Sequence, residues 1–181
     1  MLSVKNRESL HLAANHLFYE VSMLESAAGG LASGVAGQST ITNALLESFV
    51  IHLRNVIDFL YNDQPREDDV VAVHFFEHPK EWFDVRGEEP QKLRLARHRA
   101  HKELAHLTYT RQTVTLEQKL WRIDELLAEI NPTLFKFVLE VGSLLDGTDW
   151  RTPGGYQIVH ALAPPSQDPP PDRTEPPPPT T

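Results

Sequence analysis

The spacing of apolar residues along the chain predicts helices rather than strands. From residue 5 to residue 27, apolar side chains recur every three or four positions, which places them on one face of a helix. The residues on this face are Leu10, Ala13, Leu17, Val21 and Leu24. We expect this helix to stop at Gly29 and Gly30, because the small residues that follow them are typical of a loop.

Residues 41–61 form the most apolar stretch of the chain and predict a helix at the centre of a bundle. Apolar side chains cover roughly half of its circumference, so other helices should surround it. The hydroxyl residues at 39–40 are suited to cap its N-terminus. Its narrow polar side carries Glu47, Arg54 and Asp58, whose spacings of seven and four residues align them along the helix.

The pattern changes between residues 62 and 90. A polar turn is followed by a mixture of β-branched and aromatic residues without the strict alternation of a solvent-facing strand. We expect two short helices here, near 68–76 and near 79–84. A strand over 70–76 is the alternative.

Three further helices are predicted in the second half of the chain. The first covers 91–107 and has a thin apolar side, so most of it should face solvent or a partner. The second covers 116–130. Asn131 and Pro132 are typical of an N-cap and a first helical position, so a separate last helix is expected over 133–145.

Helical patterning ends near residue 147. Residues 163–181 contain nine prolines among small polar residues, a composition that cannot bury enough apolar surface to fold. The predicted architecture is therefore an all-α, four- to five-helix antiparallel bundle over 1–147 with a disordered Pro-rich tail over 148–181.

Composition narrows the functional classes. The chain has no cysteine, which excludes disulfides, thiolate metal sites and a cysteine nucleophile. It contains neither a phosphate-binding loop nor a dinucleotide fingerprint, so no cofactor is expected. No secretory signal or membrane-spanning segment is recognisable, and we expect a cytoplasmic protein without a membrane partner.

The net charge of −8 hides a strong local asymmetry. Residues 91–111 hold six Lys or Arg and one acid, whereas residues 62–89 hold nine acids and three Lys or Arg. One interpretation is a solvated basic face whose charge balances that of the neighbouring acidic segment. The other is a basic surface that binds a polyanion.

Arg99 and His106 are candidates for chemistry on such a polyanion. They are seven residues apart and therefore share a helix face, and Lys102 lies close to His106 around the helix. A guanidinium can hold a phosphate with two hydrogen bonds, and an imidazole can transfer a proton near neutral pH. Together they could cleave RNA by transfer of the 2′-hydroxyl to phosphorus without a metal.

The segment from Arg99 to His106 resembles the Arg-x4–6-His signature of HEPN domains, at its long limit. These domains are small helical bundles, commonly dimeric, and many are ribonucleases of toxin–antitoxin or other defence systems. The resemblance implies a homodimer that binds RNA and uses Arg99 and His106 as catalytic residues. Ala100 departs from the pattern, because active members often have Asn or Asp after the arginine.

Three other residues would support RNA binding with positive charge in this interpretation. They are Arg54, Lys102 and Arg111. Arg54 and Asn55 match the start of the same signature, but the match is incomplete because Phe59 occupies the position of the histidine.

Two alternatives remain open from the sequence. Glu47, Arg54 and Asp58 can form a structural ion-pair network that fixes the central helix, in place of an anion site at Arg54. Separately, the chain can be a non-catalytic helical scaffold with a protein partner.

A metal site is the weaker alternative, and no metal is predicted. His74 and His78 are four residues apart, but Pro79 follows directly and a third ligand would have to come from His52 or His16.

Overall fold

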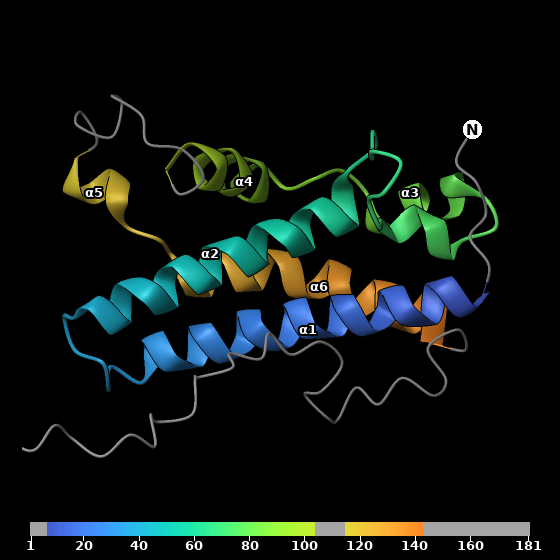
Figure 1. Ribbon diagram of the computed structural model, residues 1–181. Coiled ribbons are helices and arrows are strands. Elements are labelled where there is room, and N and C mark those ends of the chain that lie inside the picture. The colour runs from blue at the N-terminus through green and yellow to red at the C-terminus, as the bar shows by residue number, and fades with distance from the viewer. Residues whose placement is uncertain (1–6, 104–114, 143–181) are drawn as a thin grey trace, which may run out of the picture.

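The computed structural model describes residues 7–103 and 115–142, and within them the protein is an all-α helical bundle. Helices α1 and α2 run antiparallel side by side, α6 lies behind them, and α3 and α4 lie along the other side of α2 (Figure 1). In chain order the elements are α1 (Arg7–Ala32), α2 (Thr40–Tyr61), the 3-10 helix η1 (Ala72–Phe75), α3 (Pro79–Arg86), α4 (Gln91–Glu103), α5 (Leu116–Lys119) and α6 (Ile123–Val141).

The predicted end of the first helix is wrong, because α1 continues through Gly29 and Gly30 to Ala32. A glycine inside a helix costs only about 1 kcal/mol, which packing can offset. At Gly30 the packing is close, since an added Cβ would lie 3.2 Å from the Leu45 side chain of α2. The helix therefore continues past Gly29, and Gly30 allows Leu45 of α2 to approach closely.

Helix α2 matches its prediction in both length and position in the bundle. Ser39 caps its N-terminus, and the Ser39 hydroxyl accepts a hydrogen bond from the Thr42 amide. Eight of its residues are buried, from Phe49 to Tyr61. This helix contacts α1, α4, α6 and η1, as expected for the most apolar element.

The segment after α2 packs its aromatic residues onto the bundle as two short helices. Only Ala72–Phe75 is helical in the first predicted region, as a 3-10 turn, and α3 covers the second. No strand is found in the described residues, so the alternative of a strand over 70–76 is wrong. Trp82 of α3 is fully buried, and its indole N–H donates to the Leu60 carbonyl at 2.9 Å.

The last helices differ from the prediction in where they break. Helix α5 is a single turn, and a non-helical linker at 120–122 separates it from α6. Helix α6 then runs from Ile123 to Val141 with Pro132 inside it, so a new helix does not start at Asn131. Pro132 is exposed while Ile130 and Phe137 are buried, and the core contacts on either side hold the two halves as one helix.

The predicted fold class is confirmed for the described residues. The predicted tail at 148–181 lies outside them, as do residues 104–107 of the predicted 91–107 helix. No helix in the described part of the chain is long and apolar enough to cross a membrane.

Candidate functional site

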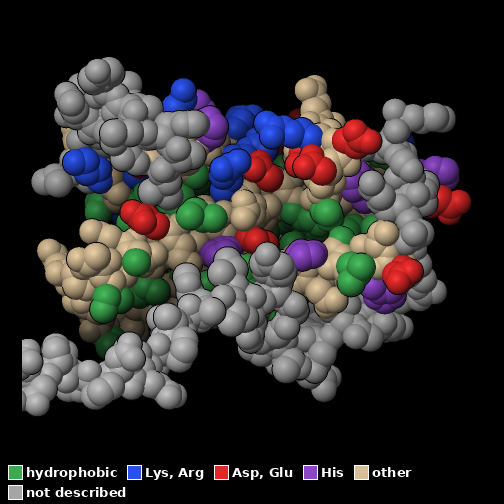
Figure 2. Space-filling view, viewed as in Figure 1, with side chains coloured by type: hydrophobic (Ala, Val, Ile, Leu, Met, Phe, Trp, Pro, Cys, Tyr) green, Lys and Arg blue, Asp and Glu red, His purple; other side chains and the backbone are tan. Residues whose placement is uncertain are grey.

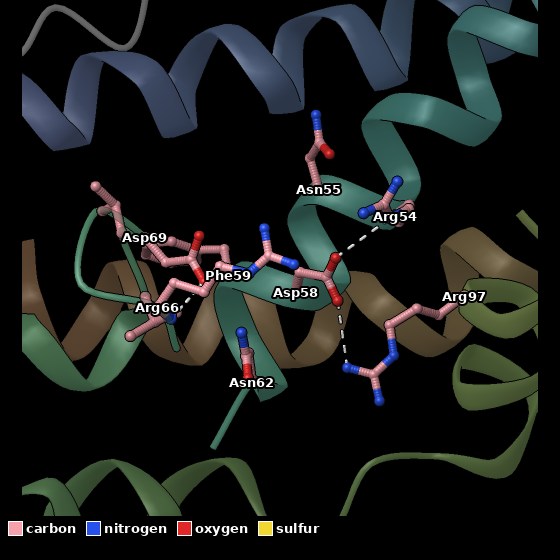
Figure 3. Close-up of a pocket in the computed structure, with 10 residues that line it drawn as sticks. Arg54, Asn55, Asp58, Phe59, Asn62, Arg66, Asp69 and Arg97 are labelled. Carbon is pink, nitrogen blue, oxygen red and sulfur yellow. Dashed lines mark hydrogen bonds and ion pairs between the residues drawn. The ribbon is translucent and has the colours of Figure 1, made fainter. Parts of the chain in front are cut away.

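A polar cleft of about 410 Å³ opens between the C-terminal half of α2, the loop that follows it, and α4. Three arginines and two aspartates line the cleft, which gives it a net charge of +1. The arginines are Arg54, Arg66 and Arg97, and they come from three different segments (Figure 3). The local excess of positive charge contrasts with the net charge of −8 for the whole chain.

The Asp58 carboxylate lies between two of these guanidinium groups (Figure 3). Its Oδ2 is 3.4 Å from Arg54 Nε, one turn earlier on α2, and its Oδ1 is 3.3 Å from Arg97 Nη1 on α4. The side chains of Arg54 and Asp58 are 41% and 36% exposed. Solvent or a ligand can therefore reach both groups.

Glu89 holds the other side of the Arg97 guanidinium. Arg97 Nη2 donates to Glu89 Oε2 at 2.8 Å. The Glu89 side chain is only 13% exposed, and its Oε1 is buried without a hydrogen-bond partner. Burial raises the pKa of Glu89 above its ordinary value of 4.5, and the charge of Arg97 opposes that rise. Arg97 is thus shared between a partly exposed carboxylate and a nearly buried one.

The loop after α2 brings Arg66 to the cleft through local hydrogen bonds. The Arg66 amide donates to Asp69 Oδ2 at 2.7 Å, which closes a tight turn. Asn62 Oδ1 accepts from the Gln64 amide at 3.0 Å, so the side chain of Asn62 is oriented with its amide nitrogen available. No ion pair of the Arg66 guanidinium is found among the described residues, and Arg66 is exposed.

A polar contact between α1 and α2 fixes the edge of the cleft near α1. Asn55 lines the cleft, and its Nδ2 donates to Glu20 Oε2 at 2.9 Å. The same oxygen lies 2.7 Å from His52 Nδ1, so one carboxylate binds two side chains of α2. His52 is therefore a largely buried histidine with a polar partner.

Arg99, a predicted catalytic residue, is engaged in contacts within the chain. Its Nε donates to Glu103 at 2.7 Å and its Nη1 donates to the Leu120 carbonyl at 2.8 Å. Its guanidinium carbon also lies 4.0 Å from the centre of the Trp121 ring. These contacts attach the linker before α6 to α4. Arg99 does not line the cleft that contains Arg54 and Arg97.

The other predicted site residues are only partly brought together. Lys102 is exposed on α4, whereas His106 and Arg111 lie outside the described residues. Of the predicted ion-pair residues, Asp58 pairs with Arg54. Glu47 is exposed and forms no ion pair within the part of the chain that the structure describes.

Some basic residues of α4 form ion pairs with acids, as expected if the basic segment balances the charge of the acidic segment at 62–89. Arg97 pairs with Glu89 from the acidic segment, but Lys92 pairs with Glu125 of α6 at 3.0 Å. On the face shown in Figure 2, Lys and Arg side chains gather between α4 and the C-terminal end of α2, with acidic side chains directly beside them.

The histidines proposed as alternative metal ligands are dispersed. His74 is buried in η1, while His78 is exposed at the start of α3. Within the described ranges, no three His, Asp or Glu residues are grouped as metal ligands.

Arg66 and Arg97 were not among the residues that the sequence predicts as a binding site. Arg97 belongs to the basic 91–111 segment, so its charge was visible, but its partners are set by how α4 packs on α2. Arg66 lies in an acidic turn with no helical periodicity. Only the folded loop brings it to the cleft that Arg54 also lines.

Comparisons with models of protein families, with curated proteins and with solved structures find no match for this chain. The resemblance to HEPN domains therefore stays a prediction.

Proposed function

We propose that the protein binds RNA and that the cleft between α2 and α4 receives the phosphate backbone. The observation that supports this is the convergence of Arg54, Arg66 and Arg97 on one cavity of about 410 Å³ in an otherwise acidic chain. Guanidinium groups bind phosphate through paired hydrogen bonds and remain charged at every physiological pH.

The position of Asp58 indicates how an anion would enter. Its two oxygens contact Arg54 and Arg97 at 3.4 and 3.3 Å, distances that are long for charge-assisted hydrogen bonds. A phosphate oxygen could replace Asp58 at Arg54 or at Nη1 of Arg97, while the short pair between Nη2 of Arg97 and Glu89 stays in place. Arg66 would supply a third donor from the loop.

We further propose that the protein is a metal-independent ribonuclease of the HEPN-like kind, in which His106 transfers the proton. In that reaction the ribose 2′-oxygen attacks phosphorus and its proton passes to a base. The 5′-oxygen leaves with a proton from an acid, which gives a 2′,3′-cyclic phosphate and a 5′-hydroxyl. His106 lies three residues beyond the described end of α4.

Binding is tested by titrating fluorescently labelled single-stranded RNA with the wild-type protein, Arg97→Gln and Arg94→Gln. Arg94 is exposed on the same helix but does not line the cleft, so its loss changes the charge equally. We expect Arg97→Gln to weaken binding about tenfold and to lower the salt dependence by about one counterion. Equal losses in the two variants would contradict the cleft as the binding site.

Cleavage is tested separately in EDTA with the same RNA. We expect the wild-type protein to cleave it and His106→Ala to lose cleavage while retaining helicity and RNA binding. Cleavage that survives in His106→Ala would exclude His106, and an inactive wild-type protein that still binds RNA would leave binding as the function.

One observation favours a second candidate, a helical interaction protein that forms a homodimer. Phe135 and Leu139 lie one turn apart on α6 and are 63% and 64% exposed. Together they form an exposed apolar strip on α6 that a second copy of the chain could cover. We expect Phe135→Glu to shift a dimer to a monomer in sedimentation, and a wild-type protein that is already monomeric would contradict this candidate.

A further inference from the structure

A second cavity, of about 590 Å³, lies between the end of α1 and the start of α6. Its volume falls in the range of about 300–1,000 Å³ that is typical of small-molecule sites. It is distinct from the arginine-lined cleft, because the two cavities share no lining residue.

The walls of this cavity are mainly apolar. The apolar residues that line it are Ala28, Leu31, Ala32, Trp121, Ile123 and Leu127. Leu31, Trp121, Ile123 and Leu127 are only partly buried although they pack against the core. A ligand with an apolar body would therefore remove hydrophobic surface from water here.

The charged groups of the cavity are all negative. Glu25 on α1 and Asp124 on α6 line it, and no Lys or Arg does. Both carboxylates belong to the described residues, and neither forms an ion pair there. This contrasts with the first cavity, where Asp58 pairs with Arg54 and Arg97.

The end of α1 adds to the negative potential. The last four residues of this helix, Gly29 to Ala32, all lie at or beside the cavity, and its last turn carries no basic side chain. The carbonyl groups at a helix C-terminus favour a cation. Trp121 contributes an aromatic wall, and one face of its ring is already covered by the Arg99 guanidinium at 4.0 Å, so the ring serves mainly as apolar surface for the body of the ligand.

We infer that this cavity binds a small organic cation, namely an amine with an aromatic or aliphatic body. The apolar walls take the body of the ligand, and Glu25 and Asp124 bind its ammonium group. This inference does not depend on RNA binding, because the residues, the charge and the ligand class all differ from those of the arginine cleft.

The test is an NMR titration of the full chain with 4-phenylbutylamine and, as a matched anion, 4-phenylbutyrate. We expect the amine to shift the Trp121 indole and Leu127 methyl signals saturably, with a Kd of about 1 mM or tighter. The carboxylate should not bind. Equal binding of both probes, or no saturable shift up to about 10 mM amine, would overturn the inference.

Two kinds of variant locate the bound amine. Glu25→Gln and Asp124→Asn should each weaken amine binding about threefold to tenfold, whereas Glu47→Gln, an exposed acid outside the cavity, should not. Gly29→Leu should weaken amine binding by placing a bulky side chain at the wall of the cavity, and nothing lies within 4 Å of the added Cβ, so the helix should remain intact. Unchanged amine binding in a folded Gly29→Leu variant would place the ligand elsewhere and overturn the inference.

Discussion

Arg97 Nη1 lies 3.3 Å from Asp58 Oδ1, and this contact joins α4 to α2 at the proposed RNA site. The pair has two roles that act in opposite directions. It links two helices of the bundle, and it places a carboxylate where a phosphate would have to bind. Removing the carboxylate while keeping both arginines separates these roles.

We expect Asp58→Asn to raise the affinity for single-stranded RNA about twofold to fivefold at low salt, because Arg54 and Arg97 lose a competing anion. The cost in unfolding free energy should not exceed about 1 kcal/mol, since both partners of Asp58 are partly exposed. The measurements are RNA titration and urea denaturation.

Asp84→Asn is the matched control for Asp58→Asn. Asp84 is an exposed aspartate that pairs with Lys80 at 2.5 Å on α3, away from the cleft. The Asp84→Asn substitution changes the net charge by the same amount as Asp58→Asn and should leave the RNA affinity unchanged. If both variants raise affinity alike, the effect is one of net charge and Asp58 does not compete for the site.

The raised pKa of Glu89 predicts that the free energy of unfolding depends on pH. Burial raises the pKa of Glu89, so the folded state holds this proton more tightly than the unfolded chain does. The resulting stabilisation is complete below the ordinary value of 4.5 and is lost as the pH rises through the higher folded value. Glu89→Gln removes this loss, because a glutamine does not ionise.

We therefore expect the stability of Glu89→Gln, relative to wild type, to increase between about pH 4 and about pH 7. Urea denaturation at several pH values measures this difference. Glu88→Gln removes one acid from an exposed neighbour and serves as the control for the change in net charge. A stability difference for Glu89→Gln that does not change with pH would show that the ionisation of Glu89 is not linked to folding.

Hydrophobic periodicity was sufficient to predict the class of the fold, but not every helix boundary. Gly30 and Pro132 both appeared as helix-breaking signals, and both lie inside helices. Each is tolerated because of tertiary packing: Leu45 closes on Gly30, and buried Ile130 and Phe137 flank exposed Pro132. Such contacts come from other helices and have no local signature in the sequence.

The candidate site could be predicted only where its residues share a helix. Arg54 and Asp58 are four residues apart on α2, and their pairing follows from helical geometry. Arg97 and Arg66 reach the cleft through the packing of α4 and the folding of a loop, which periodicity does not encode. The sequence also could not indicate that Arg99 would bind Leu120 and Trp121 across a chain separation of about 20 residues.

Arg99 provides a test of structural against catalytic roles. Arg99→Lys keeps the positive charge but loses the planar group that contacts Glu103, the Leu120 carbonyl and the Trp121 ring. We expect a loss of about 1–2 kcal/mol in unfolding free energy from these contacts. Because Arg99 does not line the cleft, RNA affinity should change less than in Arg97→Gln.

An RNA cleavage assay of the Arg99→Lys variant then distinguishes a catalytic role of Arg99 from a structural one. A loss of cleavage in a protein that still binds RNA would support Arg99 as a catalytic residue. Retained cleavage with lower stability would assign it to the attachment of the linker before α6. If Arg99→Lys is as stable as the wild type, the contacts of Arg99 with Glu103, Leu120 and Trp121 do not stabilise the fold.

A buried hydrogen bond between Tyr61 and Thr133 joins α2 to α6 and should contribute to the free energy of unfolding. Their hydroxyl oxygens are 2.8 Å apart in the core, and the residues are 4% and 6% exposed. Burial raises the pKa of Tyr61 above its ordinary value of 10.0, so the phenol keeps its proton further into alkaline pH than an exposed tyrosine does. Tyr61→Phe should lower the unfolding free energy by about 1–2 kcal/mol, because it leaves the Thr133 hydroxyl without this partner.

A double-mutant cycle isolates this hydrogen bond from the packing of the ring. Thr133→Val removes the other hydroxyl, and the variant with both changes should lose less stability than the sum of the two single losses. Urea denaturation of the four proteins gives a coupling energy that we expect to be about 0.5–1.5 kcal/mol. Additive losses would mean that the two hydroxyls do not stabilise each other, and the close approach of α2 and α6 would then depend on the surrounding apolar contacts alone.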